Sequence, residues 1–159
     1  MNTSFRCRLA IVALSSLGVL FLVGQANPAG ITDPWTKAQL ISPESLNKRL
    51  TETKRAKPLL IHVGFRALYV QGHIPGSVYY GPAARPEGLG ELRKHLQELP
   101  RDKEIILYCG CCPWSDCPNL RPAFRALKEM GFKQVKVLDI PDRLSTDWAA
   151  KGYPLEKGE

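Results

Sequence analysis

The sequence predicts an α/β fold in which helices cover both faces of a central parallel sheet. Short apolar runs with the length of buried strands recur at Leu59–Val63, Ser77–Gly81, Glu104–Cys109 and around Val135 and Leu138. Segments with helical periodicity alternate with these runs, and that alternation is typical of a parallel sheet. A hydrophobic fraction of 44% and a charged fraction of 23% fit a single globular domain.

Three segments have the pattern of helices. Ser42, followed by a proline and a glutamate, is a good N-cap for a helix that begins there. The leucines of Gly90–Leu99 fall on one helical face. The segment Asn119–Phe132 has the strongest apolar stripe, with Asn119 placed to cap the helix and Gly131 placed to end it. We expect these segments to cover the sheet.

Residues 1–26 differ in composition from the rest of the chain. Two arginines precede the apolar run Leu9–Val23, and Gly24 and Ala26 follow it as the small residues of a cleavage site. This order is typical of a secretory signal peptide, and the run is shorter than the roughly 20 residues that span a bilayer. We therefore expect an exported protein, periplasmic or secreted. An uncleaved anchor is the alternative, and it would be the chain's contact with a membrane.

The number and distribution of basic residues indicate which classes of binding partner fit the chain. The formal net charge is +7, but the basic residues are scattered and form no run interleaved with aromatics. This distribution argues against nucleic-acid binding and is compatible with small anionic substrates. We interpret residues 27–40 as a loose lead-in segment and residues 41–157 as the domain. The sequence carries no signal for the oligomeric state.

Four of the five cysteines lie in one loop, "CGCCPWSDCP", after the third expected strand. Ligands of parallel α/β folds bind beyond the carboxyl ends of the strands, so this loop is the expected site. Backbone N–H groups and a helix dipole at such a position lower a cysteine pKa from about 8.5 to roughly 3.5–7.5. Cys109, at the end of the strand, is therefore the candidate nucleophile. The alternative is a buried thiol without a chemical role.

Several short motifs, "LLIHVGFRALYVQGHIPGS", "IILYC" and "WAAKGYP", occur in an order that resembles the rhodanese-like sulfurtransferases. The resemblance implies a rhodanese-like fold and, at Cys109, a nucleophile that accepts a sulfane sulfur as a persulfide. It implies no cofactor, and a small sulfur-containing anion or a protein thiol as the partner. In the expected substrate loop, the ring of Trp114 would either form a wall of the pocket or cover the core, and Arg121 would add positive charge near the thiol. The loop residues are Gly110, Pro113, Trp114, Ser115 and Arg121.

The chain departs from the family pattern near the expected site. His62 replaces the usual aspartate of the first strand, either as a partly buried structural histidine or as a proton donor near the site. Gly64 and Leu68 replace an arginine and its glutamate partner, and losing both charges leaves neither unpaired, so we interpret the change as structural. The loop is also several residues longer. Phosphatases of the same fold need an arginine where this chain has Ser115, so phosphate chemistry is disfavoured.

The remaining cysteines are candidates for redox chemistry or metal binding. An exported protein meets an oxidising compartment, and a disulfide between Cys112 and Cys117 across "PWSD" is the favoured bridge. Two arrangements stay open: Cys109 with Cys111 as a nucleophile and its resolving thiol beside a structural Cys112–Cys117 bridge, or Cys109–Cys117 as an exchangeable bridge. Thiol–disulfide exchange is therefore a second form of the expected activity. We expect no metal; the alternative is a non-catalytic binding module that holds Cu(I) or a partner thiol through all four cysteines.

Overall fold

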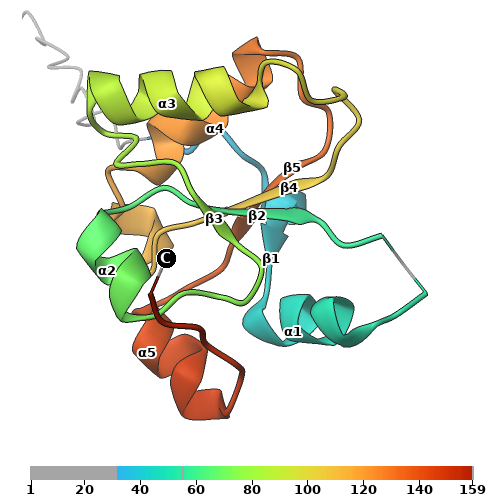
Figure 1. Cartoon of the computed structure of the whole chain (residues 1–159), viewed down its shortest axis with the longest axis vertical. Coiled ribbons are helices and arrows are strands. Elements are labelled where there is room, and N and C mark those ends of the chain that lie inside the picture. The colour runs from blue at the N-terminus through green and yellow to red at the C-terminus, as the bar shows by residue number, and fades with distance from the viewer. Residues whose placement is uncertain (1–31, 55, 159) are drawn as a thin grey trace, which may run out of the picture. The chain divides into compact units, whose positions relative to one another are not determined.

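Five parallel strands form one sheet in the order β1-β5-β4-β2-β3, as seen in the computed structural model (Figure 1). The structure describes residues 32–54 and 56–158; the expected signal peptide lies outside the described residues. Within these ranges, no helix has the length and hydropathy needed to cross a membrane. The strands are β1 Leu40–Ile41, β2 Leu59–His62, β3 Val78–Tyr79, β4 Ile105–Tyr108 and β5 Val135–Leu138.

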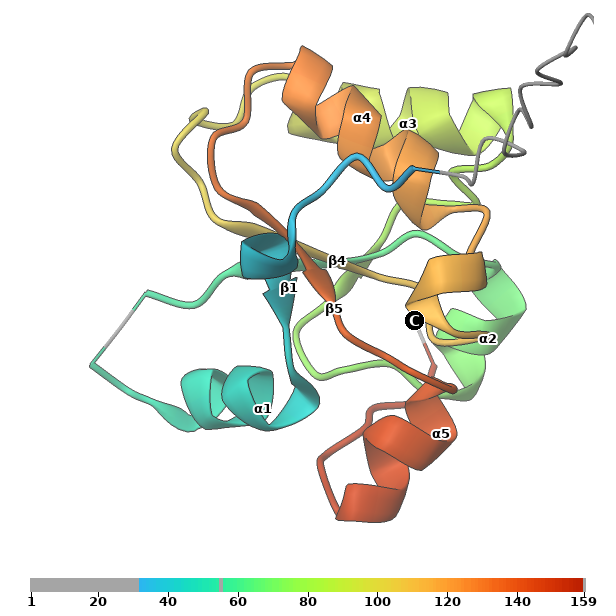
Figure 2. The same cartoon turned by 180° about the vertical axis from the view of Figure 1, so that it is seen from behind.

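Helices cover both faces of this sheet, so the predicted fold class is confirmed. The helices α3 and α4 lie side by side over one face, and α1 and α5 lie over the other (Figures 1 and 2). A short helix, α2, follows directly after β2. The bounds are α1 Pro43–Thr51, α2 Arg66–Gln71, α3 Pro86–Leu96, α4 Leu120–Glu129 and α5 Leu144–Asp147.

The alternation of side chains along the strands divides the core into two clusters. In β4, Ile105 and Leu107 pack toward α3 and α4, whereas Ile106 and Tyr108 pack toward α1 and α5. All four side chains are fully buried, and a buried side chain of this size contributes about 1.5–3 kcal/mol to folding. Cys109 continues the alternation on the α3 and α4 side. The alternation of side chains along β4 therefore determines toward which face of the sheet the side chain of Cys109 points.

The helix ends agree with the sequence in two of three cases. Ser42 Oγ accepts a hydrogen bond of 3.2 Å from the amide of Ser45 and caps α1. Gly131 has a φ of +87° and directly follows the C-terminal end of α4. Asn119 precedes α4 but makes no capping hydrogen bond with its side chain, so the prediction of a cap is wrong there.

The lead-in segment is not loose throughout. Trp35 is 7% exposed and belongs to the core cluster on the α4 side. Its ring packs edge-to-face on Phe124 of α4 and on Trp114 of the cysteine loop, with centroid distances of 5.4 and 6.0 Å. Asp33 forms an ion pair with Arg121 at 2.6 Å. This part of the segment consequently clamps the cysteine loop to α4.

Candidate active site

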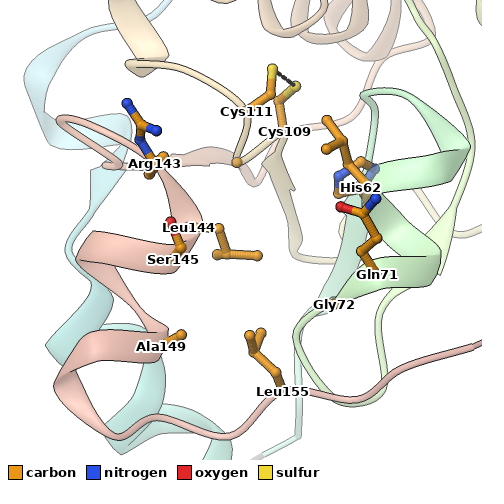
Figure 3. Close-up of a pocket in the computed structure, with 12 residues that line it drawn as sticks. His62, Gln71, Gly72, Cys109, Cys111, Arg143, Leu144, Ser145, Ala149 and Leu155 are labelled. Atoms are coloured by element: carbon orange, nitrogen blue, oxygen red, sulfur yellow. Dashed lines mark hydrogen bonds between the residues drawn. The ribbon is translucent and has the colours of Figure 1, made fainter.

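A tight turn after β4 brings two of the cysteine sulfurs together. Gly110 has a φ of +80°, a conformation that favours glycine, and a Cβ atom there would lie 2.8 Å from Cβ of Leu144. Its carbonyl accepts a 3.0 Å hydrogen bond from the Leu144 amide at the start of α5. The sulfurs of Cys109 and Cys111 lie 3.2 Å apart on the two sides of this glycine (Figure 3).

These residues form part of the wall of a cavity of about 340 Å³. In Figure 3, Gln71 of α2 lies across the cavity from Leu144 and Ser145 of α5. Among the described residues that line it, Arg143 alone carries a full charge at neutral pH. The cavity lies at the carboxyl end of the sheet, where the sequence predicted it. Its lining is His62, Leu68, Gln71, Gly72, Cys109, Gly110, Cys111, Arg143, Leu144, Ser145, Ala149 and Leu155.

Cys109 is only 3% exposed, and its sulfur has close neighbours that the sequence did not reveal as site residues. Nδ2 of Asn119 approaches the sulfur to 3.8 Å, while Oδ1 accepts a 3.0 Å hydrogen bond from the Ala84 amide. On the other side, a Cβ atom on Gly64 would lie 2.6 Å from the sulfur. Asn119 is therefore a positioning residue, and Gly64 leaves the space that the sulfur occupies.

Cys117 is the cysteine of the loop whose pKa is lowered. A hydrogen bond with Cys109 is the main cause that lowers the pKa of Cys117 to about 6, and the backbone N–H groups of Asn119 and Leu120 add to it. The same hydrogen bond, together with burial, raises the pKa of Cys109. The expectation of a depressed pKa at Cys109 is therefore wrong, because the long loop places Cys117 at the start of α4. Burial is also the main cause that raises the pKa of Cys112 to about 12.

His62 is a buried residue that lines the cavity, and one of its ring nitrogens makes no hydrogen bond within the described part of the chain. The side chain is 1% exposed, and its Nδ1 has no hydrogen-bond partner among the described residues. Burial lowers the pKa of His62 to about 4. The ring is therefore neutral at pH 7, and the residue lines the cavity although its Nδ1 is buried.

The other residues predicted for the substrate loop do not line this cavity. Their contacts instead fix the position of the loop. The Trp114 amide donates a 2.9 Å hydrogen bond to the Ile140 carbonyl, and its ring covers Trp35 in the core. Arg121 binds the carbonyl of Ser115, pairs with Asp33 and lies over the ring of Trp35. Arg121 thus cannot supply charge to the cavity. Of the predicted loop residues, Gly110 alone lines it; Pro113, Trp114, Ser115 and Arg121 do not.

All four cysteines of the loop are free thiols in this structure. Cys112 contacts Cys111, with the two sulfurs 3.4 Å apart, and also shares a hydrogen bond with Cys117, its favoured disulfide partner. Cys117 and Cys109 share a hydrogen bond. No group of three or more His, Cys, Asp or Glu side chains is arranged to hold a metal ion within the described part of the chain. The alternative of a four-cysteine Cu(I) site gains no support from this arrangement.

A family model and several solved structures match the architecture of this chain. The family model of the rhodanese-like domain matches residues 42–140, more than half of the chain. The Alr3790 protein from Anabaena sp. shares 22% identity and a TM-score of 0.57, over 74% of this chain and 92% of that chain. The single-domain sulfurtransferase RDL2 from Saccharomyces cerevisiae shares 23% identity and a TM-score of 0.50, over 72% and 90% of the two chains.

A larger protein contains the same fold. Thiosulfate sulfurtransferase from Pseudomonas aeruginosa shares 24% identity and a TM-score of 0.53, over 76% of this chain and 20% of that chain. A comparison with curated proteins gives no match. The extent of the family match and the parallel sheet with its two helical layers agree. The chain therefore belongs to the family of rhodanese-like domains.

Proposed function

We propose that the protein transfers sulfane sulfur through a persulfide on Cys109. The observation that carries this proposal is the position of Cys109, directly after β4 and on the wall of a cavity of about 340 Å³. Ligands of parallel α/β folds bind at this edge of the sheet. Membership of the rhodanese-like family, and a fold shared with sulfurtransferases, support sulfur transfer as the chemistry.

The hydrogen bond between Cys109 and Cys117 supplies a path for the proton. In the first half-reaction, the Cys109 sulfur attacks the outer sulfur of the donor, and its proton passes to the Cys117 thiolate. The bond between the outer sulfur and the rest of the donor breaks, and the rest leaves as an anion with the electron pair. In the second half-reaction, an acceptor thiolate attacks the outer sulfur of the persulfide. Cys109 then leaves with the bonding electrons and regains its proton from Cys117.

The lining of the cavity favours a small anionic donor. Arg143, which pairs with Asp142 at 3.2 Å, places a positive charge at the cavity, while Leu68, Leu144 and Leu155 give it apolar walls. A thiosulfonate-type anion, with one charged end and a reactive sulfur, fits both features. The acceptor in the second half-reaction is a small thiolate or the thiol of a partner protein.

Release of sulfite from thiosulfate tests the proposal, because sulfite reports the first half-reaction whatever happens to the persulfide afterwards. We expect the wild-type protein to release sulfite and Cys109→Ser to release none. Cys112→Ser changes a thiol of the same loop that does not line the cavity and gives Cys117 only a minor hydrogen bond; it is the matched control and is expected to release sulfite nearly as wild type does. Equal sulfite release by Cys109→Ser and wild type would contradict the assignment of Cys109.

A further inference from the structure

We propose that, when no acceptor thiol takes the sulfur, Cys111 resolves the persulfide on Cys109, so that the protein releases the sulfur as hydrogen sulfide and retains a Cys109–Cys111 disulfide. This inference rests on the proposed function. It specifies the fate of the sulfur atom and the class of the final electron donor, which is an external dithiol.

The geometry of the turn carries the inference. The two sulfurs lie 3.2 Å apart, within contact distance, and both residues line the same cavity. One residue separates the two cysteines, so their Cα atoms lie within about 7 Å, the limit for a disulfide. Gly110 holds the turn with its φ of +80° and its hydrogen bond to Leu144. The resolving sulfur is thus already in place when the persulfide forms.

Exposure distinguishes Cys111 from the other neighbour of Cys109. Cys111 is exposed, whereas Cys109 is 3% and Cys117 is 0% exposed. A resolving disulfide must be reopened in each cycle, and thiol–disulfide exchange needs access to one of its sulfurs. A Cys109–Cys117 bridge would be closed to an external dithiol, but a Cys109–Cys111 bridge offers the exposed sulfur of Cys111. Exposed or strained disulfides are also the more easily reduced ones.

The step balances without a further oxidant. Cys111 loses its proton, and its sulfur attacks Sγ of Cys109. The bond between Cys109 Sγ and the outer sulfur breaks; the outer sulfur leaves with the electron pair as HS⁻ and takes up a proton. The two cysteines are oxidised to the disulfide, and the sulfane sulfur is reduced to sulfide. The dithiol then attacks Cys111, and closure of its own disulfide returns both cysteines to thiols.

A single-turnover assay of sulfide tests the inference. The mature protein is mixed with excess thiosulfate in the absence of any other thiol, and sulfite, sulfide and the state of the cysteines are followed. We expect a burst of about one sulfide per protein, which then stops until a dithiol is added. Peptide mapping after alkylation should find Cys109 joined to Cys111. In Cys111→Ser we expect the sulfite, no sulfide burst, and a persulfide that remains on Cys109.

Cys112→Ser is the matched control, because its sulfur contacts Cys111 at 3.4 Å but the residue does not line the cavity. We expect it to keep the sulfide burst. Sulfite without sulfide in the wild type, or a Cys109–Cys117 disulfide, would overturn the inference and leave the proposed function standing, whereas a persulfide on Cys111 in place of Cys109 would overturn both. Absence of sulfite from every variant would overturn both.

Discussion

The sulfur of Cys109 occupies space that is open only because residue 64 is glycine. A Cβ atom on Gly64 would lie 2.6 Å from that sulfur and 3.0 Å from Cε1 of His62. The family pattern has an arginine at this position. Its replacement therefore does more than remove an ion pair: it shapes the site around the sulfur.

Gly64→Ala is expected to destabilise the protein and displace the Cys109 sulfur. The added methyl group must push apart two buried side chains, and such overpacking costs about 1–3 kcal/mol. Urea unfolding and the sulfite assay should both show a loss. Gly90→Ala is the control, since a Cβ atom at Gly90 in α3 meets nothing within 4 Å and its φ is unstrained. It should leave sulfite release unchanged and match or exceed wild-type stability; a similar loss in both variants would contradict the steric argument.

The sheet and its strongest helix could be predicted from the sequence because their signals are local. The apolar runs of β2, β4 and β5 have the length of buried strands, and the stripe of α4 repeats with helical periodicity. The placement of Cys109 directly after β4 followed from this pattern. The two-residue strand β1 and the short helix α2 were missed, because segments of that length carry no periodicity of their own.

The charge distribution in the site could not be predicted, since it depends on contacts between distant segments. Trp35 and Asp33 hold the loop from outside the expected domain, and the Ile140 carbonyl binds the Trp114 amide. In the loop held by these contacts, the backbone amides of Asn119 and Leu120 lower the pKa of Cys117. Asn119 was predicted as a cap because its position fits one; the structure directs its side chain to Ala84 and Cys109 instead.

We propose that the protein is exported and that the mature chain begins at Asn27. Gly24 and Ala26 form the cleavage site that motivates the prediction. Intact-mass measurement of protein recovered from outside the cytoplasm should give the mass of the chain from Asn27 onward. A chain that retains Met1 and remains in the membrane fraction would support the anchor instead.

Trp35→Ala is expected to loosen the cysteine loop as well as the fold. Its ring contacts Phe124 and Trp114 and is 7% exposed, and truncating a buried aromatic costs about 3–5 kcal/mol. Urea unfolding of the mature protein should show this loss. Phe65→Ala removes an aromatic that is 47% exposed and should stay within about 0.5 kcal/mol of wild type. Equal effects would mean that residues before β1 do not support the domain.

Arg143→Gln is expected to weaken the binding of an anionic donor. Its side chain is 61% exposed, so the loss should be modest, about two- to fivefold in KM for thiosulfate, with little change in kcat. Arg93→Gln removes the same charge from α3, where Arg93 pairs with Glu129 away from the cavity. An equal rise in KM in both variants would show that overall charge, and not the position of Arg143, attracts the donor.

The lowered pKa of Cys117 predicts how the rate of sulfite release falls at acidic pH. Its thiolate accepts the proton of Cys109, and its pKa is lowered to about 6 by the hydrogen bond with Cys109 and the amides of Asn119 and Leu120. Below that pH, Cys117 becomes protonated and can no longer act as the base. The rate of sulfite release should therefore be level above about pH 6 and fall about tenfold per pH unit below it.

Cys117→Ser provides the discriminating measurement for this prediction. Serine does not ionise in this range, so the variant should release sulfite slowly at all pH values and lose the inflection near pH 6. Cys112→Ser should keep an inflection at slightly higher pH, because Cys112 itself does not titrate there and gives Cys117 only the least of the hydrogen bonds that lower its pKa. An unchanged inflection in Cys117→Ser would assign the titration to another group and remove Cys117 from the proton path.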